Sequence, residues 1–164
     1  MTIKYTPKLV LLTLFITFLT SCSKEEGIDE VYSSDIQLTY TDIEYEIFNL
    51  VNDYRTSNGL TKLIVLNIIS KEAVNHTNYM IETGDISHYN FNKRHQNLVT
   101  YASAKNVGEN IAYGYNSAQG VVNSWVNSDG HREIIENKNY THFGISTKKN
   151  SEGRYYFTNI FIEK

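Results

Sequence analysis

The last strand-like segment of the chain, residues 155–162, constrains the fold most because both of its sides are largely apolar. One side would carry Tyr156, Thr158, Ile160 and Ile162, and the other would carry Tyr155, Phe157, Asn159 and Phe161. A strand with two apolar faces is covered on both sides, because a solvated face would show alternating polar residues. Residues 142–147 form a second strand ahead of it. The sequence therefore predicts a three-layer α-β-α domain of the α+β class.

Three segments upstream have the residue spacing of helices with one apolar face. They are residues 41–55, residues 67–82, and a third segment that Asn116 or Ser117 caps. The first begins with a threonine and a glutamate in a capping box, and Asn67 is predicted to cap the second. Trp125 belongs to the apolar stripe of the third segment and is predicted to be a core residue.

A polar stretch between the second and third segments carries no regular period. Residues 87–94 (Ser-His-Tyr-Asn-Phe-Asn-Lys-Arg) are rich in turn formers and are predicted to be a loop, which favours a functional role for His88. Asn52 and Arg55, at the end of the first helix, are interpreted as solvated surface residues. The alternative is that they form a polar network with the loop that follows.

The N-terminus has the layout of an export signal. Two lysines precede the apolar run Leu9–Leu19, which is too short to span a bilayer stably, and small residues follow it. Leu19-Thr20-Ser21-Cys22 resembles a bacterial lipobox, in which the cysteine becomes the lipidated first residue of the mature protein. We therefore expect residues 1–21 to be a lipoprotein signal peptide.

The segment after the signal is polar and acidic. We expect Cys22 to carry palmitate-type acyl chains, residues 22–40 to be a flexible tether, and residues 41–164 to be the folded domain. Ser23-Lys24-Glu25-Glu26 resembles the tag that directs some lipoproteins to the outer membrane surface. The predicted location is a membrane, most simply the outer membrane, with the domain periplasmic or surface-exposed.

The charge of the chain argues against a nucleic-acid partner, and its cysteine content argues against disulfide bonds. The net charge is −3 at pH 7 with no basic patch, so no nucleic-acid partner is expected. Cys22 is the only cysteine, so no disulfide stabilises the domain. Packing must do so, and 13 tyrosines and 7 phenylalanines supply much of the apolar bulk.

Glu109 is the strongest candidate for a functional residue. It lies in Val107–Gly114, a run of small and apolar residues, so it must be solvated at a rim or paired in a pocket. His76, His88 and His131 are the candidate partners. His76 shares a helix face with apolar residues, so it is expected to surround the ligand residues without contacting a ligand itself. The predicted loop position of His88 favours a functional role for that residue.

His131 is ranked as the best placed of the three histidines. Ser128 or Asp129 can cap a new helical turn there, which holds His131 near free backbone amides. The positive end of a helix disfavours imidazolium, so His131 is predicted to be neutral near pH 7 and able to accept a hydrogen bond or bind a metal.

Taken in order, these motifs resemble the bacterial branch of the CAP superfamily. This is the SCP domain shared by cysteine-rich secretory, antigen 5 and pathogenesis-related 1 proteins. The resemblance covers about residues 41–162, and the residues that carry it most clearly are Gly108-Glu109-Asn110-Ile111-Ala112-Tyr113-Gly114, Trp125, Ser128-Asp129-Gly130-His131-Arg132 and Tyr155–Phe161. It implies an α-β-α sandwich around a mainly antiparallel sheet, with a central cleft.

In eukaryotic members that cleft holds two histidines and two glutamates, in some cases with a divalent cation. The resemblance places these at Glu109, His88 and His131, while Ser128 stands where the second glutamate falls. A zinc or other divalent site at His88, Glu109 and His131 is one prediction, with His76, Asn110, Ser128 and Asp129 around it. A serine is a poor zinc ligand, so Asp129 or His76 would have to complete the set.

Two functions remain open from the sequence. The preferred one is a membrane-anchored module that binds a lipid, peptide or cell-wall component in a His/Glu cleft. The alternative is a metal-dependent hydrolase of the peptidase type, with Glu109 and His131 as the candidate catalytic residues. No catalytic set is assembled along the sequence, so enzymatic activity is left undecided.

Overall fold

The structure, a computed structural model, describes residues 1–2 and 37–164. The predicted signal peptide, Cys22 and nearly all of the predicted tether therefore lie outside the described residues. Within the described part of the chain, no helix combines the length and the apolar character needed to cross a membrane.

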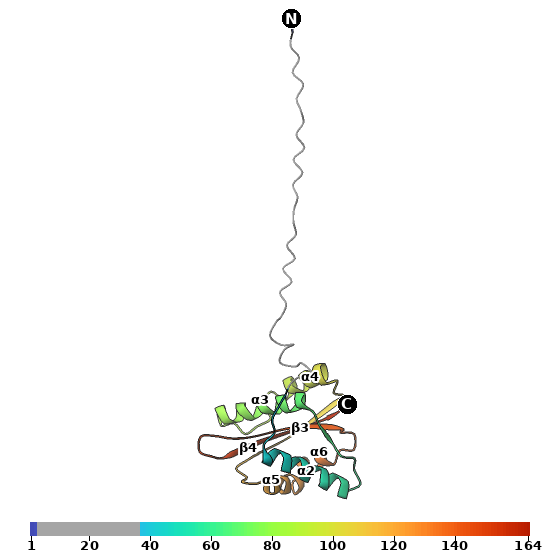
Figure 1. Ribbon diagram of the computed structural model, residues 1–164, viewed down its shortest axis with the longest axis vertical. Coiled ribbons are helices and arrows are strands. Elements are labelled where there is room, and N and C mark those ends of the chain that lie inside the picture. Colours follow the sequence, from blue (N-terminus) through green and yellow to red (C-terminus); the bar gives the residue numbers. More distant parts are fainter. Residues whose placement is uncertain (3–36) are drawn as a thin grey trace.

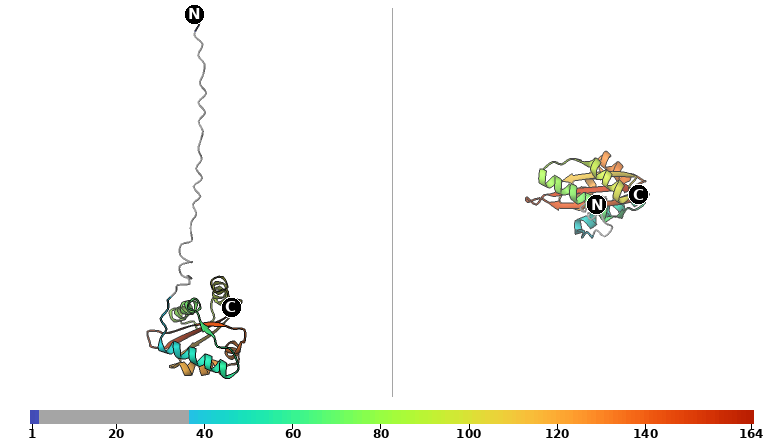
Figure 2. Two further views of the ribbon diagram at one scale, coloured as in Figure 1. Left: turned by 45° about the vertical axis from the view of Figure 1, so that its right-hand side comes forward. Right: turned by 90° about the horizontal axis from the view of Figure 1, so that it is seen from above.

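The domain is a three-layer sandwich, as Figure 1 shows. The sheet consists of β1 (Ile64–Val65), β2 (Asn106–Tyr113), β3 (His142–Lys149) and β4 (Tyr155–Glu163). Helices α3 (Asn67–Thr83) and α4 (Phe91–Ala102) lie over one face. Helices α2 (Asp42–Ser57), α5 (Ala118–Val126) and α6 (Asp129–Glu136) lie over the other, and Figure 2 shows the same division from the side. The predicted α-β-α architecture is confirmed.

The sheet is mixed but mainly antiparallel. Its strand order is β1-β3-β4-β2, with β4 antiparallel to both neighbours and β1 parallel to β3. Strand β4 is central and buried on both faces, as its two apolar sides predict: Phe157 and Phe161 join the core under α2, α5 and α6, whereas Ile160 and Ile162 join the core under α3. Strand β2 lies at one edge, and its Glu109 side chain pairs with Arg94 of α4.

The N-terminal caps of α2 and α5 are the ones that the sequence predicts. Thr41 and Glu44 form the predicted capping box, in which the backbone N–H of Thr41 donates to Glu44 Oε2 at 2.8 Å. The second oxygen of Glu44 accepts from the backbone N–H of Thr147 at 2.7 Å, which ties α2 to β3. Ser117 caps α5. The prediction for Asn67 is wrong, because it is the first residue of α3 and Leu66 is the cap.

Helix α4 is the element that the sequence did not predict. Residues 91–94 were expected to belong to a loop but form its first turn, after a left-handed Asn90 with φ of 56°. Its buried residues are Arg94, Leu98 and Ala102, at spacings of four. Because the first of them is a charged residue, the apolar stripe that usually reveals a helix is incomplete.

The interpretation of Asn52 and Arg55 as solvated residues is also wrong. Both side chains are buried. The Asn52 side chain exchanges two hydrogen bonds with the backbone of Leu63, at 2.7 and 3.0 Å. Arg55 donates to the backbone carbonyl of Thr61 at 2.9 Å, so both residues form the polar network with the following loop that was the alternative.

Candidate functional site

Glu109 lies near the middle of β2, buried against α4. Both of its carboxylate oxygens accept hydrogen bonds from Arg94, whose Nε lies 2.7 Å from Oε2 and whose Nη2 lies 2.7 Å from Oε1. A guanidinium that engages both oxygens of a carboxylate forms a strong and directional pair. Arg94 also donates from Nη1 to the carbonyl oxygen of Tyr89 at 2.7 Å. The isolated carboxylate of the sequence is therefore half of a buried ion pair.

Two of the three candidate histidines gather around this pair. His88 Nδ1 lies 2.8 Å from Glu109 Oε1, and the His88 side chain is 50% exposed. His76, on α3, is fully buried, and its Nε2 lies 3.9 Å from the same oxygen. His76 Nε2 also lies 2.9 Å from the carbonyl oxygen of Ser87, so Nε2 carries the proton and donates it there.

The protonation states follow from this geometry. Burial alone would raise the pKa of Glu109, but the hydrogen bonds from His88 and Arg94 and the charge of Arg94 hold the pKa below its ordinary value. Burial lowers the pKa of His76, and the Arg94 charge adds to this effect against the opposing charge of Glu109. At neutral pH the cluster therefore contains an ionised Glu109, a charged Arg94 and a neutral His76.

His131, which the sequence analysis ranked as the best placed partner of Glu109, does not lie beside that carboxylate. Ser128 is the N-cap of α6, and His131 Nδ1 lies 3.0 Å from its Oγ. The backbone carbonyl of His131 accepts from Asn110 Nδ2 at 3.0 Å. Among the described residues, His131 makes no hydrogen bond or ion pair with Glu109. The pKa of His131 is lowered, in the predicted direction, but the causes are burial and the nearby His88.

Asp129 points away from the cluster. Its side chain is exposed, and Oδ1 pairs with Arg132 Nη2 at 2.6 Å. The position three residues after Trp125 therefore offers a serine hydroxyl that is already bonded to His131. Neither Ser128 nor Asp129 supplies a carboxylate beside Glu109.

The donor set as arranged does not fit a divalent cation. Across residues 1–2 and 37–164, no three histidine, cysteine, aspartate or glutamate side chains converge on a point where a metal ion could sit. A cation at Glu109 would have to displace Arg94, which already neutralises the carboxylate at 2.7 Å. Zinc sites need at least three protein donors free to face the ion.

A cavity opens beside the Glu109 cluster, with a volume of about 290 Å³. Its apolar walls come from α4, β2, α6 and the loop before β3, and consist of Phe91, Val107, Ile134 and Tyr140. Its polar wall is His88 with Glu109. Gly108 allows this close approach, because a Cβ at that position would lie 2.5 Å from the Tyr140 hydroxyl. Its volume lies just below the range of roughly 300–1,000 Å³ that is typical of small-molecule pockets.

Sequence reasoning missed the two features that define this site. Arg94 was grouped with His88 but not recognised as the partner of Glu109, and the walls Ile134 and Tyr140 were not singled out. The one available signal for Arg94 was its spacing of four from Leu98 and eight from Ala102. That spacing would have placed it on the inner face of a helix.

Comparison with models of known families assigns the chain to a family. The model of the cysteine-rich secretory protein family, CAP, matches residues 48–161, which is well over half of the chain. The protein therefore belongs to the CAP family, and the resemblance inferred from its motifs is confirmed at that level.

Individual relatives agree with this assignment. The chain is 33% identical over 129 residues to the uncharacterized membrane protein YlbC of Bacillus subtilis, a match that covers 76% of this chain and 35% of YlbC. The chain thus spans about a third of that relative. An outer surface protein of Borrelia burgdorferi has a TM-score of 0.67 at 22% identity, covering 78% of this chain and 99% of that protein. An extracellular SCP-domain protein of Bacillus anthracis has a TM-score of 0.66 at 23% identity, covering 78% and 45%.

Proposed function

We propose that this CAP-domain protein is an exported, membrane-anchored lipoprotein that binds a small amphipathic ligand in the cavity beside Glu109. The observation that carries the proposal is the asymmetry of that cavity. Apolar side chains from α4, α6 and the sheet surround it, and one wall is the charge-paired Glu109 with His88. Such a cavity suits a molecule with an apolar body and one polar head.

The orientation of the His88 ring indicates the head group. Its Nδ1 lies 2.8 Å from Glu109 Oε1, so Nδ1 donates to the carboxylate and Nε2 is the ring nitrogen left to face a ligand. A ring nitrogen at the polar wall favours a ligand that brings a hydroxyl, because a hydroxyl can both donate and accept a hydrogen bond. A fatty alcohol or a monoacylglycerol has this chemistry, whereas a carboxylate would lose its hydration without gaining Arg94 as a partner, because Arg94 is already paired with Glu109.

Calorimetric titration of the purified full-length protein with 1-octanol and with octanoate tests the ligand class. We expect saturable binding of the alcohol, and at least fivefold weaker binding of the acid at pH 7.5. Ile134→Trp fills the cavity and should abolish binding. Ile64→Trp is the matched control, because Ile64 is 61% exposed on β1 and lies away from the cavity. Equal binding by both tryptophan variants would contradict the proposal, and a preference for a short peptide would replace its ligand class.

The anchor is a separate part of the proposal. It is supported by the lipobox-like Leu19-Thr20-Ser21-Cys22 and by relatives that are named a membrane protein and an outer surface protein. Growth of expressing bacteria with labelled palmitate should label the wild type and leave Cys22→Ala unlabelled. Equal labelling of the two proteins, or none in either, would remove the anchor without affecting the cavity.

The metal-dependent hydrolase remains the alternative function, and no feature of the described residues favours it. It would require Arg94 to withdraw from Glu109 and His131 to leave Ser128. Zinc binding by the wild type is the measurement that decides between this alternative and the ligand-binding module.

A further inference from the structure

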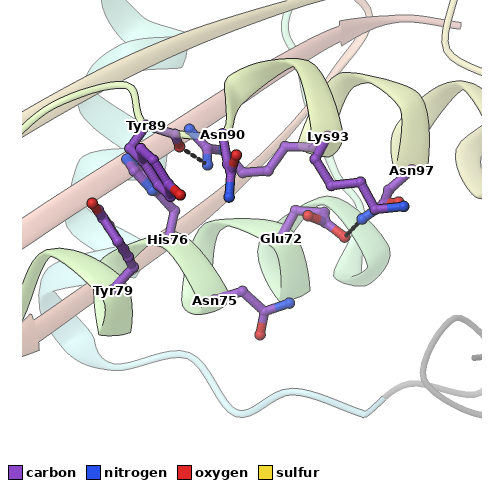
Figure 3. Close-up of a pocket in the computed structure, with 9 residues that line it drawn as sticks. Glu72, Asn75, His76, Tyr79, Tyr89, Asn90, Lys93 and Asn97 are labelled. Atoms are coloured by element: carbon purple, nitrogen blue, oxygen red, sulfur yellow. Dashed lines mark hydrogen bonds between the residues drawn. The ribbon is translucent and has the colours of Figure 1, made fainter. Parts of the chain in front are cut away.

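A second hollow is lined by His76 and Arg94 and shares no lining residue with the apolar cavity. It is formed between α3 and α4 and has a volume of about 230 Å³. Figure 3 shows His76, Tyr79 and Tyr89 at one end and Glu72, Lys93 and Asn97 at the other. Asn75, Asn90 and Arg94 complete the lining.

The depth of this hollow distinguishes it from an ordinary groove between two surface helices. Three of its lining residues are ionisable and at least nine-tenths buried, namely Glu72, His76 and Arg94. Buried ionisable groups are costly and are kept where they are paired or used. Arg94 is paired with Glu109, and Glu72 accepts from Asn97 Nδ2 at 3.0 Å. The polar floor of the hollow is therefore pre-organised.

The aromatic end is an exposed stacking surface. The rings of Tyr79 and Tyr89 are parallel within 12° and their centroids are 4.7 Å apart. Tyr79 is also nearly parallel to the buried His76 ring, and its hydroxyl donates to Asp85 at 3.0 Å. Tyr89 is nevertheless 53% exposed. A tyrosine held in a stack with its outer surface in solvent presents a flat face at little further entropic cost.

We infer that this hollow binds a neutral saccharide. A pyranose ring has an apolar C–H face that packs on an aromatic ring and a rim of hydroxyls that pair with amides and carboxylates. The lining offers both: Tyr89 for the face, and three asparagines with Glu72 and Lys93 for the rim. The hollow, at about 230 Å³, is smaller than the roughly 300–1,000 Å³ of pockets for drug-sized molecules, which favours a ligand of the size of one sugar ring.

The charges of the lining disfavour the main competing ligand classes. Arg94 is committed to Glu109 and the Tyr89 carbonyl, so Lys93 is the cation left to meet a ligand, and it shares the hollow with Glu72. A phosphate or sulfate would therefore meet a carboxylate as well as an ammonium. A long apolar chain would cover the polar rim without satisfying it. This inference is independent of the amphipathic ligand proposed for the other cavity.

Saturation-transfer NMR on the full-length protein, with chitotriose, cellotriose and maltotriose as probes, tests the inference. We expect at least one trisaccharide to bind saturably, with the strongest transfer to the C–H protons on one ring face. Chitotriose alone would identify acetamido sugars, and binding of all three would identify the pyranose ring itself. No saturable binding of any of the three overturns the inference.

Two variants assign the binding to this hollow. Tyr89→Ala should weaken binding at least tenfold, whereas Tyr89→Phe, which keeps the ring, should bind within twofold of the wild type. Tyr45→Ala is the matched control, because Tyr45 is similarly exposed at 56% but lies on α2, on the other side of the sheet. Binding that survives Tyr89→Ala, or that is lost equally in Tyr45→Ala, contradicts the assignment. Ile134→Trp should leave saccharide binding unchanged, which separates this test from that of the apolar cavity.

Discussion

Two arginines are buried in this domain, and their partners differ in kind. Arg55, on α2, is fully buried and donates to the backbone carbonyls of Thr61, Ile135, Asn137 and Tyr140. Among the described residues it has no carboxylate partner within 4 Å. Arg94, on α4, is 6% exposed and pairs with the carboxylate of Glu109. Arg55 lies in the interior, whereas Arg94 lines the hollow between α3 and α4.

The difference identifies which buried charge is structural. Arg55 joins the loop after α2 to the segment between α6 and β3, and its guanidinium satisfies carbonyl oxygens near the C-terminal end of α6. That end of a helix is negative, so a cation is favoured there without a carboxylate. Arg94 instead neutralises one side chain and leaves His88 and the polar hollow open to ligands. Burial alone would not have separated the two.

Arg55→Met should have the largest effect on stability. It leaves several buried carbonyl oxygens without donors, each of which costs about 1–3 kcal/mol, partly relieved by water. We expect the free energy of unfolding in urea to fall by about 4–5 kcal/mol, near the upper limit for single substitutions. Lys62→Met, an exposed cation in the neighbouring loop, is the control. A loss below about 1 kcal/mol would mean that the network does not hold the segments together.

Arg94→Met should cost less, about 3 kcal/mol, because it leaves the buried Glu109 with His88 as its remaining hydrogen-bond partner. Arg94→Met/Glu109→Gln should recover part of that loss, since the amide carries no charge to compensate. The urea unfolding of the two single variants and the double variant measures this coupling. Additive losses would show that Arg94 acts through packing and not through the ion pair.

The pH dependence of stability should separate Glu109 from His76. The pKa of Glu109 is lowered by folding, so its contribution is present above the pKa of the unfolded carboxyl and is lost as pH falls through the folded value. The pKa of His76 is also lowered, and below the ordinary imidazole pKa of about 6.5 the unfolded chain binds a proton that the folded chain excludes. Stability should therefore fall from pH 7 to pH 5 because of His76, together with His131 and His142, whose pKa values burial also lowers, and further below pH 5 because of Glu109.

His76→Gln tests this assignment directly. It should flatten the dependence of the unfolding free energy between pH 7 and pH 5 by up to about 1.4 kcal/mol per pH unit, the limit for one proton. Glu109→Gln should flatten the dependence below pH 5 but not that between pH 7 and pH 5, because loss of the carboxylate charge lowers the pKa of His76 further. If both variants keep the wild-type profile, the carboxylate and imidazole of this cluster are not coupled to folding.

The sequence predicted the architecture well because its signals were local and apolar. The two-sided β4 and the stripe ending at Trp125 report directly on burial, and Trp125 is buried with its Nε1 donating to the Ile111 carbonyl at 3.0 Å. The site was harder to predict because its defining contacts join residues distant in the chain. His88 and Glu109 are 21 residues apart and Arg94 lies on a helix whose apolar stripe begins with that charge. Only the fold shows that Arg94, and not His131, reaches the carboxylate.

Added zinc should have the smallest effect of all on the stability of the wild type. Arg94 stands where a cation would have to bind Glu109, so added zinc should raise the midpoint of thermal unfolding no more in the wild type than in His88→Ala/His131→Ala. Arg94→Met frees both carboxylate oxygens beside His88, but these two side chains fall short of the three donors of a zinc site, so zinc should stabilise this variant only weakly. That gain should disappear in Arg94→Met/Glu109→Gln, whereas substitutions at Arg55 should create no zinc response. Tight zinc binding by the wild type that is lost in His88→Ala/His131→Ala would instead restore the metal-dependent hydrolase, and would mean that Arg94 moves aside for the ion.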